Sequence, residues 1–168
     1  MRNENRNIHC GKLRNMASVY LRKNNQLLLL YRQGNSIVSN LWIGSAGGHF
    51  EEKETNDAKA CAMRELFEEL SISEQSLSNL TLRYITLRYT DGEIRQNYYF
   101  FADYNGSNDC APISTEGICR WFKIAELTNL PMPITARQMI DHYVQTGQYD
   151  DQLYVGVSNQ EHINFIHL

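Results

Sequence analysis

The chain has 168 residues, of which 42% are hydrophobic and 21% are charged, and its formal net charge is −3. This composition is typical of a globular domain with its own core and excludes a disordered chain. The slight negative charge disfavours a general nucleic-acid-binding surface, because such surfaces concentrate Lys and Arg. A small phosphorylated ligand held through a metal ion remains compatible with it.

The first residues are polar and contain no apolar segment, so we expect no signal peptide. The longest apolar run, Leu27–Leu30, is too short to span a membrane. The sequence contains no C-x-x-C pair, so a structural zinc site is not expected, and its scattered cysteines suit a reducing compartment. We therefore expect a soluble cytoplasmic protein with no membrane and no nucleic-acid partner. The cysteines are Cys10, Cys61, Cys110 and Cys119.

The first half of the chain predicts strands followed by a helix. Residues 18–33 predict two strands around a Lys-Asn-Asn turn, and the stretch LWIGSAGG at 41–48 predicts a short strand that runs into a glycine pair. A charged loop follows. A helix is expected to begin near Thr55–Asp57, which are good capping residues, and to end at about Leu70.

The second half predicts a hairpin, a strand, a helix and a terminal hairpin. Residues 81–104 form the clearest hairpin, because two alternating aromatic runs flank Asp91-Gly92. We expect a strand at 117–124, a helix within 131–147 with Gly147 at its end, and a hairpin within 153–168. This order predicts an α/β (α+β) domain with a mixed sheet between helices.

The helix over residues 58–70 carries three glutamates within two turns, beside Arg64. Their repulsion would rise to several kcal/mol (order of magnitude) in a partly dry cleft, and one Arg cannot neutralise them. A period of 3.6 residues predicts a core-facing side formed by Ala60, Met63, Leu66, Phe67 and Leu70. The other side is then formed by Ala58, Cys61, Ala62, Glu65, Glu68 and Glu69.

A solvated charged face is the plainest interpretation of these glutamates. The preceding stretch GGHFEEKE favours another one, because Gly47 and Gly48 permit close approach of a ligand to the backbone. Carboxylate oxygens suit a hard divalent cation such as Mg²⁺, which keeps some of its waters and bridges to phosphates. The pattern therefore indicates a metal site.

The same residues resemble the signature of the Nudix (MutT-like) hydrolases. Gly48 is followed after five residues by Glu54, and after nine more by Arg64-Glu65-Leu66-x-Glu68-Glu69-x-Ser71-Ile72. The family has seven residues where this chain has nine, and Gly where Ser71 stands. The resemblance covers about residues 16–145, including LWIGSAGG and EGICRWFKIAEL. It implies a Nudix-type α/β/α sandwich with a mixed β-sheet, as a single domain over 1–168 with a C-terminal hairpin extension at 150–168.

The resemblance also implies roles for individual residues. Binding of Mg²⁺, or of Mn²⁺ in its place, is expected from Glu65, Glu68, Glu69 and the carbonyl of Gly48. The catalytic group would comprise Glu68, Glu69, Arg64 and Glu116, with Glu69 or Glu116 as the general base and Arg64 orienting a carboxylate. A plain turn carboxylate is the alternative reading of Glu116. Substrate contacts are expected from Gly47, His49 and Glu54.

The reaction implied is the magnesium-dependent hydrolysis of a diphosphate bond in a nucleoside diphosphate derivative. A nucleoside triphosphate or an oxidised nucleotide such as 8-oxo-dGTP, cleaved to monophosphate and pyrophosphate, is expected first. Hydrolysis of ADP-ribose or of a dinucleoside polyphosphate stays open, as does a non-catalytic Nudix-fold sensor. We expect a small-molecule nucleotide substrate and a monomer or homodimer. The hairpin arginines, Arg83, Arg88 and Arg95, could contact phosphates, but strand arginines are usually solvated, which is the expectation here.

Overall fold

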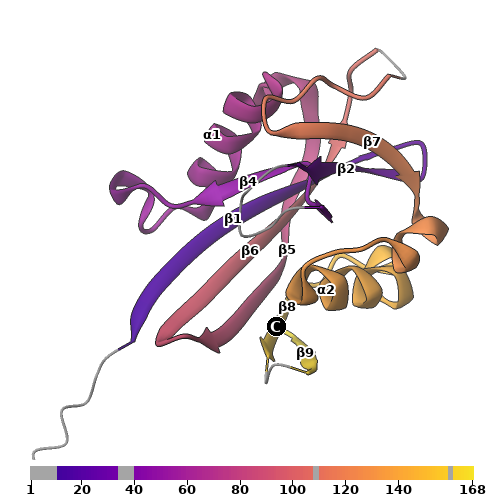
Figure 1. Cartoon of the computed structure of the whole chain (residues 1–168). Helices are drawn as coiled ribbons and strands as arrows, with labels where there is room; N and C mark the ends of the chain where they lie inside the picture. The colour runs from indigo at the N-terminus through magenta and orange to yellow at the C-terminus, as the bar shows by residue number, and fades with distance from the viewer. Residues whose placement is uncertain (1–10, 34–39, 108–109, 159–160) are drawn as a thin grey trace, which may run out of the picture.

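The computed structural model describes residues 11–33, 40–107, 110–158 and 161–168, and a mixed β-sheet forms the middle layer of this part of the chain (Figure 1). Hydrogen-bonded neighbours follow the order β3-β2-β1-β6-β5-β8-β9, with β4 paired to β1 and β7 paired to β2. The pairs β1–β6 and β5–β8 are parallel and the others are antiparallel. The strands are β1 (Lys12–Lys23), β2 (Gln26–Arg32), β3 (Leu41–Ile43), β4 (Ala46–His49), β5 (Leu77–Thr90), β6 (Glu93–Tyr104), β7 (Gly117–Lys123), β8 (Tyr154–Ser158) and β9 (Ile163–His167).

Two hairpins stand where the turn residues predicted them. Asn24 and Asn25 have φ values of 51° and 60°, and they join β1 to β2. Asp91 and Gly92, with φ values of 52° and 77°, join β5 to β6. Positive φ at both central residues matches the right-handed twist of the flanking strands, which is why Asn, Asp and Gly fill these places.

The expected single strand at 41–48 is wrong, because the chain changes partners within it. β3 pairs with β2, whereas β4 pairs with β1. Ser45 connects the two strands: its N–H donates to the carbonyl of Val19 at 2.7 Å, and its hydroxyl donates to the carbonyl of Leu28 at 2.7 Å. The glycine pair therefore lies in an extended strand and forms no turn.

The first helix, α1 (Ala58–Leu70), has the predicted ends. Asp57 caps it, since its Oδ1 accepts from the N–H of Ala60 at 2.9 Å. The helix ends at Ser71, which adopts the left-handed conformation (φ 54°, ψ 30°) in which glycine is the usual residue. Ser71 thus takes the backbone geometry of the glycine that it replaces in the family signature.

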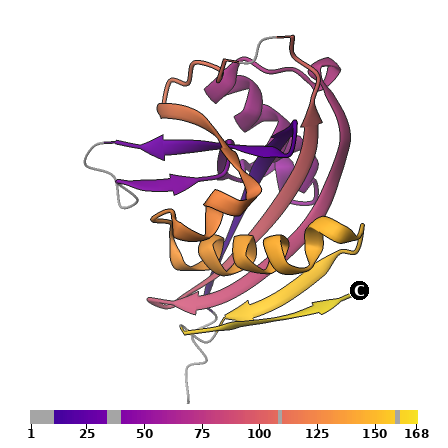
Figure 2. The same ribbon diagram turned by 90° about the vertical axis from the view of Figure 1, so that its right-hand side faces the viewer.

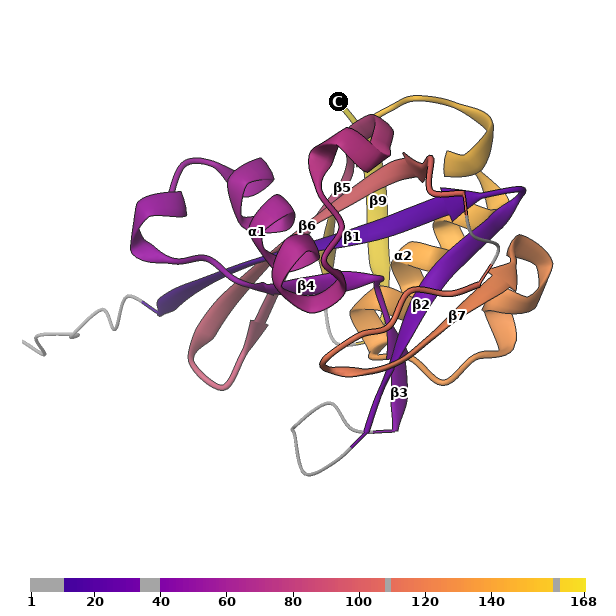
Figure 3. The same ribbon diagram turned by 90° about the horizontal axis from the view of Figure 1, so that it is seen from above.

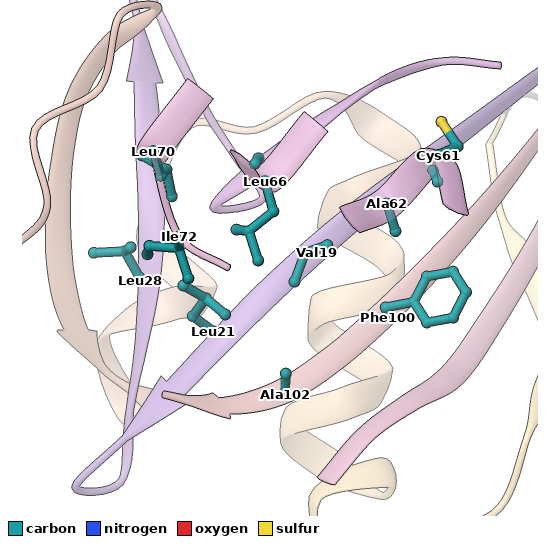
Figure 4. Packing of buried hydrophobic residues seen from close by; sticks show 12 residues of the cluster. Val19, Leu21, Leu28, Cys61, Ala62, Leu66, Leu70, Ile72, Phe100 and Ala102 are labelled. Carbon is teal, nitrogen blue, oxygen red and sulfur yellow. The ribbon is translucent and has the colours of Figure 1, made fainter. Parts of the chain in front are cut away.

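The core-facing side expected for α1 is partly wrong. Figure 4 shows Ala62, Leu66 and Leu70 pointing to Val19 and Leu21 of β1, with Phe100 and Ala102 of β6 beside them. Cys61 and Ala62 are fully buried, because these small side chains let β1 and β4 lie close to the helix. Phe67, in contrast, is 60% exposed and Ala60 is exposed. Cys61 and Ala62 therefore belong to the core, and Phe67 and Ala60 do not.

The second helix, α2 (Ile134–Gln145), covers the opposite face of the sheet, as Figures 2 and 3 show. Its Met139, Ile140 and Tyr143 pack on the tyrosines and phenylalanine of β1, β5 and β6, which are Tyr20, Tyr84 and Phe101. The helix ends at Gln145 with Thr146 as its C-cap, so Gly147 directly follows the cap and begins a 3-10 helix. Short 3-10 helices lie at Glu52–Glu54, Glu74–Ser76, Ile124–Asn129 and Gly147–Tyr149.

The strand β2 shows how the two layers share one sheet. Its residues Leu27–Leu30 are all fully buried, with Leu28 in the cluster under α1 and Leu27 and Leu29 in the cluster under α2. A continuous apolar run is expected where both faces of a strand are covered. The mixed sheet between two helical layers confirms the expected α/β/α architecture.

The terminal hairpin continues the sheet beyond β5, and Arg83 ties the chain before it to the domain. Arg83 is 2% exposed; it donates to the carbonyls of Gly147 and Gln152 and pairs with Asp150 at 2.9 Å. The expectation that Arg83 is solvated is wrong, because its β5 position faces this returning segment. Among the described helices, none has the length and apolarity needed to cross a membrane.

Candidate active site

One cavity collects most of the residues that the sequence singled out. Its volume is about 260 Å³, and β4, α1 and the loop before β7 line it together with β1 and the end of β2. We call it the acidic cavity, because four carboxylates reach it. Its lining comprises Gly47, Gly48, His49, Glu65, Glu68, Glu69, Thr115, Glu116, Met16 and Arg32.

Close packing of α1 on β4 puts the carboxylates against the glycine pair. A Cβ atom at Gly48 would collide with the carboxylate of Glu65, since even the farther oxygen, Oε2, would lie only 2.7 Å from it. The N–H of Gly47 donates to Oε2 of Glu69 at 3.4 Å. A side chain at position 48 would thus displace the flexible end of Glu65, so glycine serves a close approach here and not a turn.

Arg64 gathers several carboxylates around one guanidinium. Its Nη1 lies 2.8 Å from Oε1 of Glu65 and 3.0 Å from Oε2 of Glu68, and its Nε lies 2.7 Å from Oε1 of Glu54. Its Nη2 also donates to the carbonyl of His49 at 3.0 Å. Hydrogen bonds that Arg64 donates to Glu54 and Glu65 raise the pKa of Arg64, so the guanidinium stays charged. Arg64 therefore orients carboxylates, as the resemblance implied.

Glu54 lies beneath the site and does not line the acidic cavity. It is 2% exposed, and the hydrogen bond from Arg64 is the main cause that lowers its pKa to about 2. Arg64 and Glu54 form this pair although nine residues separate them, two more than in the family signature. The structure gives no support to the expected contact of Glu54 with substrate, because both carboxylate oxygens of Glu54 accept hydrogen bonds from Arg64.

Glu69 carries charge that the protein compensates only in part. Burial first, and then the neighbouring Glu65, raise the pKa of Glu69 to about 7, although Arg32 and the N–H of Gly47 act in the opposite direction. A raised pKa in a cleft marks a place where a positive ligand would be favoured. The acidic cavity therefore has the charge of a cation site.

Glu116 reaches the cavity from a loop 47 positions after Glu69 in the chain. The N–H of Thr115 donates to the carbonyl of Glu69 at 3.2 Å, which joins this loop to the end of α1. Oε2 of Glu116 lies 2.9 Å from Nη2 of Arg32. Our sequence analysis missed Arg32, since no motif surrounds it; pairing of β2 with β7 sets it opposite Gly117.

The remaining candidates occupy the edge of the cavity or the core. His49 lies on the cavity wall and contacts Arg14, with 2.6 Å between Nε2 and Nη2. Burial and then Arg14 lower the pKa of His49, which favours the neutral ring. Burial raises the pKa of Cys61 to about 12, so this thiol is no nucleophile.

The donor chemistry of the acidic cavity fits a hard cation, although its side chains are not closed around one. Within the described residues, no group of three His, Cys, Asp or Glu side chains is arranged to hold a metal ion. Arg64 contacts the oxygens of both Glu65 and Glu68. The Gly48 carbonyl accepts a 3.7 Å contact from the thiol of Cys61. Carboxylate and carbonyl oxygens are the ligands that Mg²⁺ prefers.

Comparison with known sequences agrees with this geometry. The sequence model of the NUDIX domain matches residues 12–143. The chain belongs to the Nudix family. It is accordingly a pyrophosphohydrolase, of a family that acts on small-molecule nucleotides and generally uses divalent metal ions.

Solved structures share the fold of this Nudix protein at low sequence identity. The MutT protein of Bacillus halodurans is 20% identical with a TM-score of 0.62, over 92% of this chain and 97% of that one. The E. coli ORF135 protein is 19% identical with a TM-score of 0.65, over 83% and 94%. A C. elegans Ap4A hydrolase is 16% identical with a TM-score of 0.62, over 82% and 99%. No curated protein matches the chain.

Proposed function

We propose that this Nudix protein hydrolyses a diphosphate bond in a nucleoside diphosphate derivative with the help of Mg²⁺. The substrate proposed first is a nucleoside triphosphate or an oxidised nucleotide, cleaved to a monophosphate and pyrophosphate. One observation carries the proposal: the carboxylates of Glu65, Glu68, Glu69 and Glu116 line one cavity in a Nudix fold.

The metal ligands in this proposal are Glu65, Glu68 and Glu69 together with the Gly48 carbonyl. When bound, a divalent cation supplies positive charge that orients the phosphate oxygens and neutralises charge on the leaving group. Glu68 has the freedom to turn toward such an ion, since its side chain is 56% exposed. Arg64 keeps Glu65 in place from behind and contacts no substrate.

In this proposal Glu116 is the general base, which accepts a proton from the attacking water. A carboxylate that holds a cation is kept ionised and is a weak proton acceptor, which argues against Glu69. Arg32 lines the cavity and pairs with Glu116. An incoming phosphate would attract this guanidinium and leave the Glu116 carboxylate free to accept a proton.

Hydrolysis assays on a nucleotide panel test the reaction directly. The panel contains ordinary and oxidised nucleoside triphosphates, ADP-ribose and a dinucleoside polyphosphate, each with Mg²⁺, Mn²⁺ or EDTA. We expect turnover that depends on the cation and is concentrated in one substrate class. Absence of turnover on the whole panel with both cations would reject the catalytic proposal in favour of a nucleotide sensor.

Glutamine variants test the assigned carboxylates. Glu68→Gln and Glu69→Gln should lose turnover while keeping the wild-type circular dichroism spectrum, because both side chains line the cavity. Tm should stay at the wild-type value for the exposed Glu68 and should not fall for the buried Glu69, since burial disfavours its charge. Glu74→Gln is the matched control: Glu74 lies outside the cavity and pairs with Lys59 at 2.6 Å. Near-normal activity of both cavity variants at saturating Mg²⁺ would refute the assignment.

We further propose a single-domain cytoplasmic enzyme that is a monomer or a homodimer. The sheet continues without a break from β5 into the terminal hairpin, which supports one domain over 1–168. Among the described cysteines, Cys61, Cys110 and Cys119 form no disulfide, which supports a reducing compartment. Light scattering on the purified chain would measure the oligomeric state.

A further inference from the structure

A second cavity adjoins the acidic cavity on the face of the sheet that α2 covers. Its volume is about 180 Å³, and it shares Met16, Arg32 and Gly47 with the acidic cavity. We call it the arginine cavity, because Arg32, Arg88 and Arg95 all line it, and its described lining contains no Asp or Glu. The two neighbouring cavities therefore differ in the sign of their charge.

Strand register lines up arginines across three neighbouring strands. Arg14 of β1 is paired with Arg95 of β6, and Arg95 is paired with Arg88 of β5. Residues paired in this way share one face of the sheet, and like charges directly opposite one another destabilise it. The fold thus keeps an arrangement whose repulsion a bound anion would relieve.

The protein supplies little negative charge to this row. Within the described chain, Glu93 is the one carboxylate that pairs with it, at 3.4 Å from Nε of Arg95 and 3.6 Å from Nη1 of Arg14. Arg88 has no acidic partner among the described residues; its Nη2 meets the hydroxyl of Thr90 at 3.5 Å.

Two polar atoms beside the arginine cavity are buried without a hydrogen-bond partner. They are Nε of Arg88 and Oδ1 of Asn97, and both residues line the cavity. A buried polar group without a partner is costly, and in native proteins it calls for a specific explanation. A ligand in the cavity would give the donor on Arg88 an acceptor.

The first turn of α2 adds a further favourable element. Thr135 and Ala136 line the arginine cavity immediately after Pro133, which precedes the helix. Helix N-termini present free N–H groups and a partial positive charge, both of which favour anions. The helix N-terminus thus adds to the positive charge of Arg88 and Arg95, which are the main groups of the cavity.

We propose that the arginine cavity binds a phosphate monoester that the substrate carries in addition to the diphosphate that is cleaved. The inference rests on the proposed hydrolysis of a diphosphate bond, and in place of a nucleoside triphosphate it names another substrate class: a nucleotide derivative with an extra phosphate monoester outside the diphosphate. Guanidinium groups match phosphate with paired, charge-assisted hydrogen bonds. Arg32 lies between the two cavities and contacts both phosphate groups of such a substrate.

Matched pairs of compounds that differ by one phosphate test this proposal. Suitable pairs are NADPH with NADH, coenzyme A with dephospho-coenzyme A, and ADP-ribose 2′-phosphate with ADP-ribose. Hydrolysis is measured with Mg²⁺, and binding is measured by calorimetry in EDTA. We expect kcat/KM, or the association constant in EDTA, to be about tenfold or more higher for the phosphorylated member of at least one pair.

Arginine variants give the specific readout. Arg88→Gln should reduce the ratio of kcat/KM for the phosphorylated and unphosphorylated members toward 1. Arg88→Lys should retain part of the preference, because Lys keeps the charge but lacks the paired donors of the guanidinium. Arg120→Gln is the matched control, since Arg120 is exposed on β7 and lies over Phe122, outside both cavities. Arg95→Gln replaces Arg88→Gln if the latter fails to fold.

The outcomes separate this inference from the proposed function. Cation-dependent hydrolysis with equal kcat/KM for both members of all three pairs overturns the inference and leaves the hydrolase. A phosphate preference in binding without hydrolysis of these six compounds, lost in Arg88→Gln, supports the inference, and the reaction is then decided by the nucleotide panel alone. A preference that Arg88→Gln and Arg95→Gln both retain in full overturns the arginine cavity as its cause.

Discussion

Replacing Arg64 by Ala would remove the one guanidinium that holds the buried carboxylate of Glu54. The two side chains form a double contact, with Nε to Oε1 at 2.7 Å and Nη2 to Oε2 at 3.0 Å. Glu54 keeps a hydrogen bond from the N–H of Glu51 at 2.9 Å and a weak one from the thiol of Cys61. In Arg64→Ala, the carboxylate of Glu54, a residue that is 2% exposed, thus loses its counter-ion.

The expected loss of stability is about 3 kcal/mol. Removing one partner of a buried ion pair costs roughly 3–5 kcal/mol, because the other charge stays buried. The low end applies here, since 18% of the Arg64 side chain is exposed and water screens the pair. For a domain of this size, a loss of about 3 kcal/mol corresponds to roughly 6–12 °C in Tm.

Urea unfolding as a function of pH tests both the size and the cause of this loss. The pKa of Glu54 is lowered from 4.5 to about 2 in the folded protein, chiefly by Arg64. The stabilisation by ionised Glu54 is therefore fully present above pH 4.5 and is lost as the pH falls toward 2. The difference in unfolding free energy between wild type and Arg64→Ala should accordingly shrink below pH 4.5.

A matched control is Lys59→Ala on the same helix. Lys59 pairs with Glu74 at 2.6 Å, but both side chains are more than half exposed. Its loss should cost less than about 1 kcal/mol. The reasoning is refuted if Arg64→Ala unfolds within about 1 kcal/mol of wild type at pH 7, or if its deficit stays constant down to pH 3.

Three further predictions follow from single contacts. Gly48→Ala should displace the Glu65 carboxylate, because a Cβ atom at position 48 would overlap it. In steady-state assays kcat/KM should fall on the order of a hundredfold, with little change in Tm. Wild-type activity of this variant would contradict the close approach. Leu66→Ala should cost about 2–5 kcal/mol in urea unfolding, while Phe67→Ala, at a 60% exposed position, should cost less than about 1; equal costs would contradict the observed helix face. Ser71→Gly should stabilise the chain by about 1 kcal/mol, because the left-handed conformation at φ 54° strains Ser and not Gly; an unchanged or lower Tm would argue against strain at this helix end.

Local sequence signals were sufficient for the elements whose geometry is local. Asp91-Gly92 placed the β5–β6 hairpin, because few other residues accept positive φ at both central positions. Asp57 marked the start of α1, since an N-cap acts within three residues of itself. The Arg64-Glu65 register placed the carboxylates on that helix, and the match to the NUDIX domain confirmed the fold class.

Burial could not be obtained from helical periodicity in the same way. Leu66 and Phe67 are neighbours and both apolar, so a period of 3.6 residues alone does not say which one meets the sheet. The close approach of β4 decides it, by burying Cys61 and Ala62 and turning Phe67 outward. In the same way, only the contact with Arg64 showed that Glu54 keeps its partner despite two extra residues.

The sequence by itself determined the hairpin turns, the helix caps and the class of chemistry, because each depends on residues close together in the chain. Tertiary structure alone decided what surrounds that chemistry. Pairing of β2 with β7 brought Arg32 to Glu116, and the register of β1, β6 and β5 lined up Arg14, Arg95 and Arg88. Such contacts join distant segments through strand register, which no local pattern in the sequence encodes.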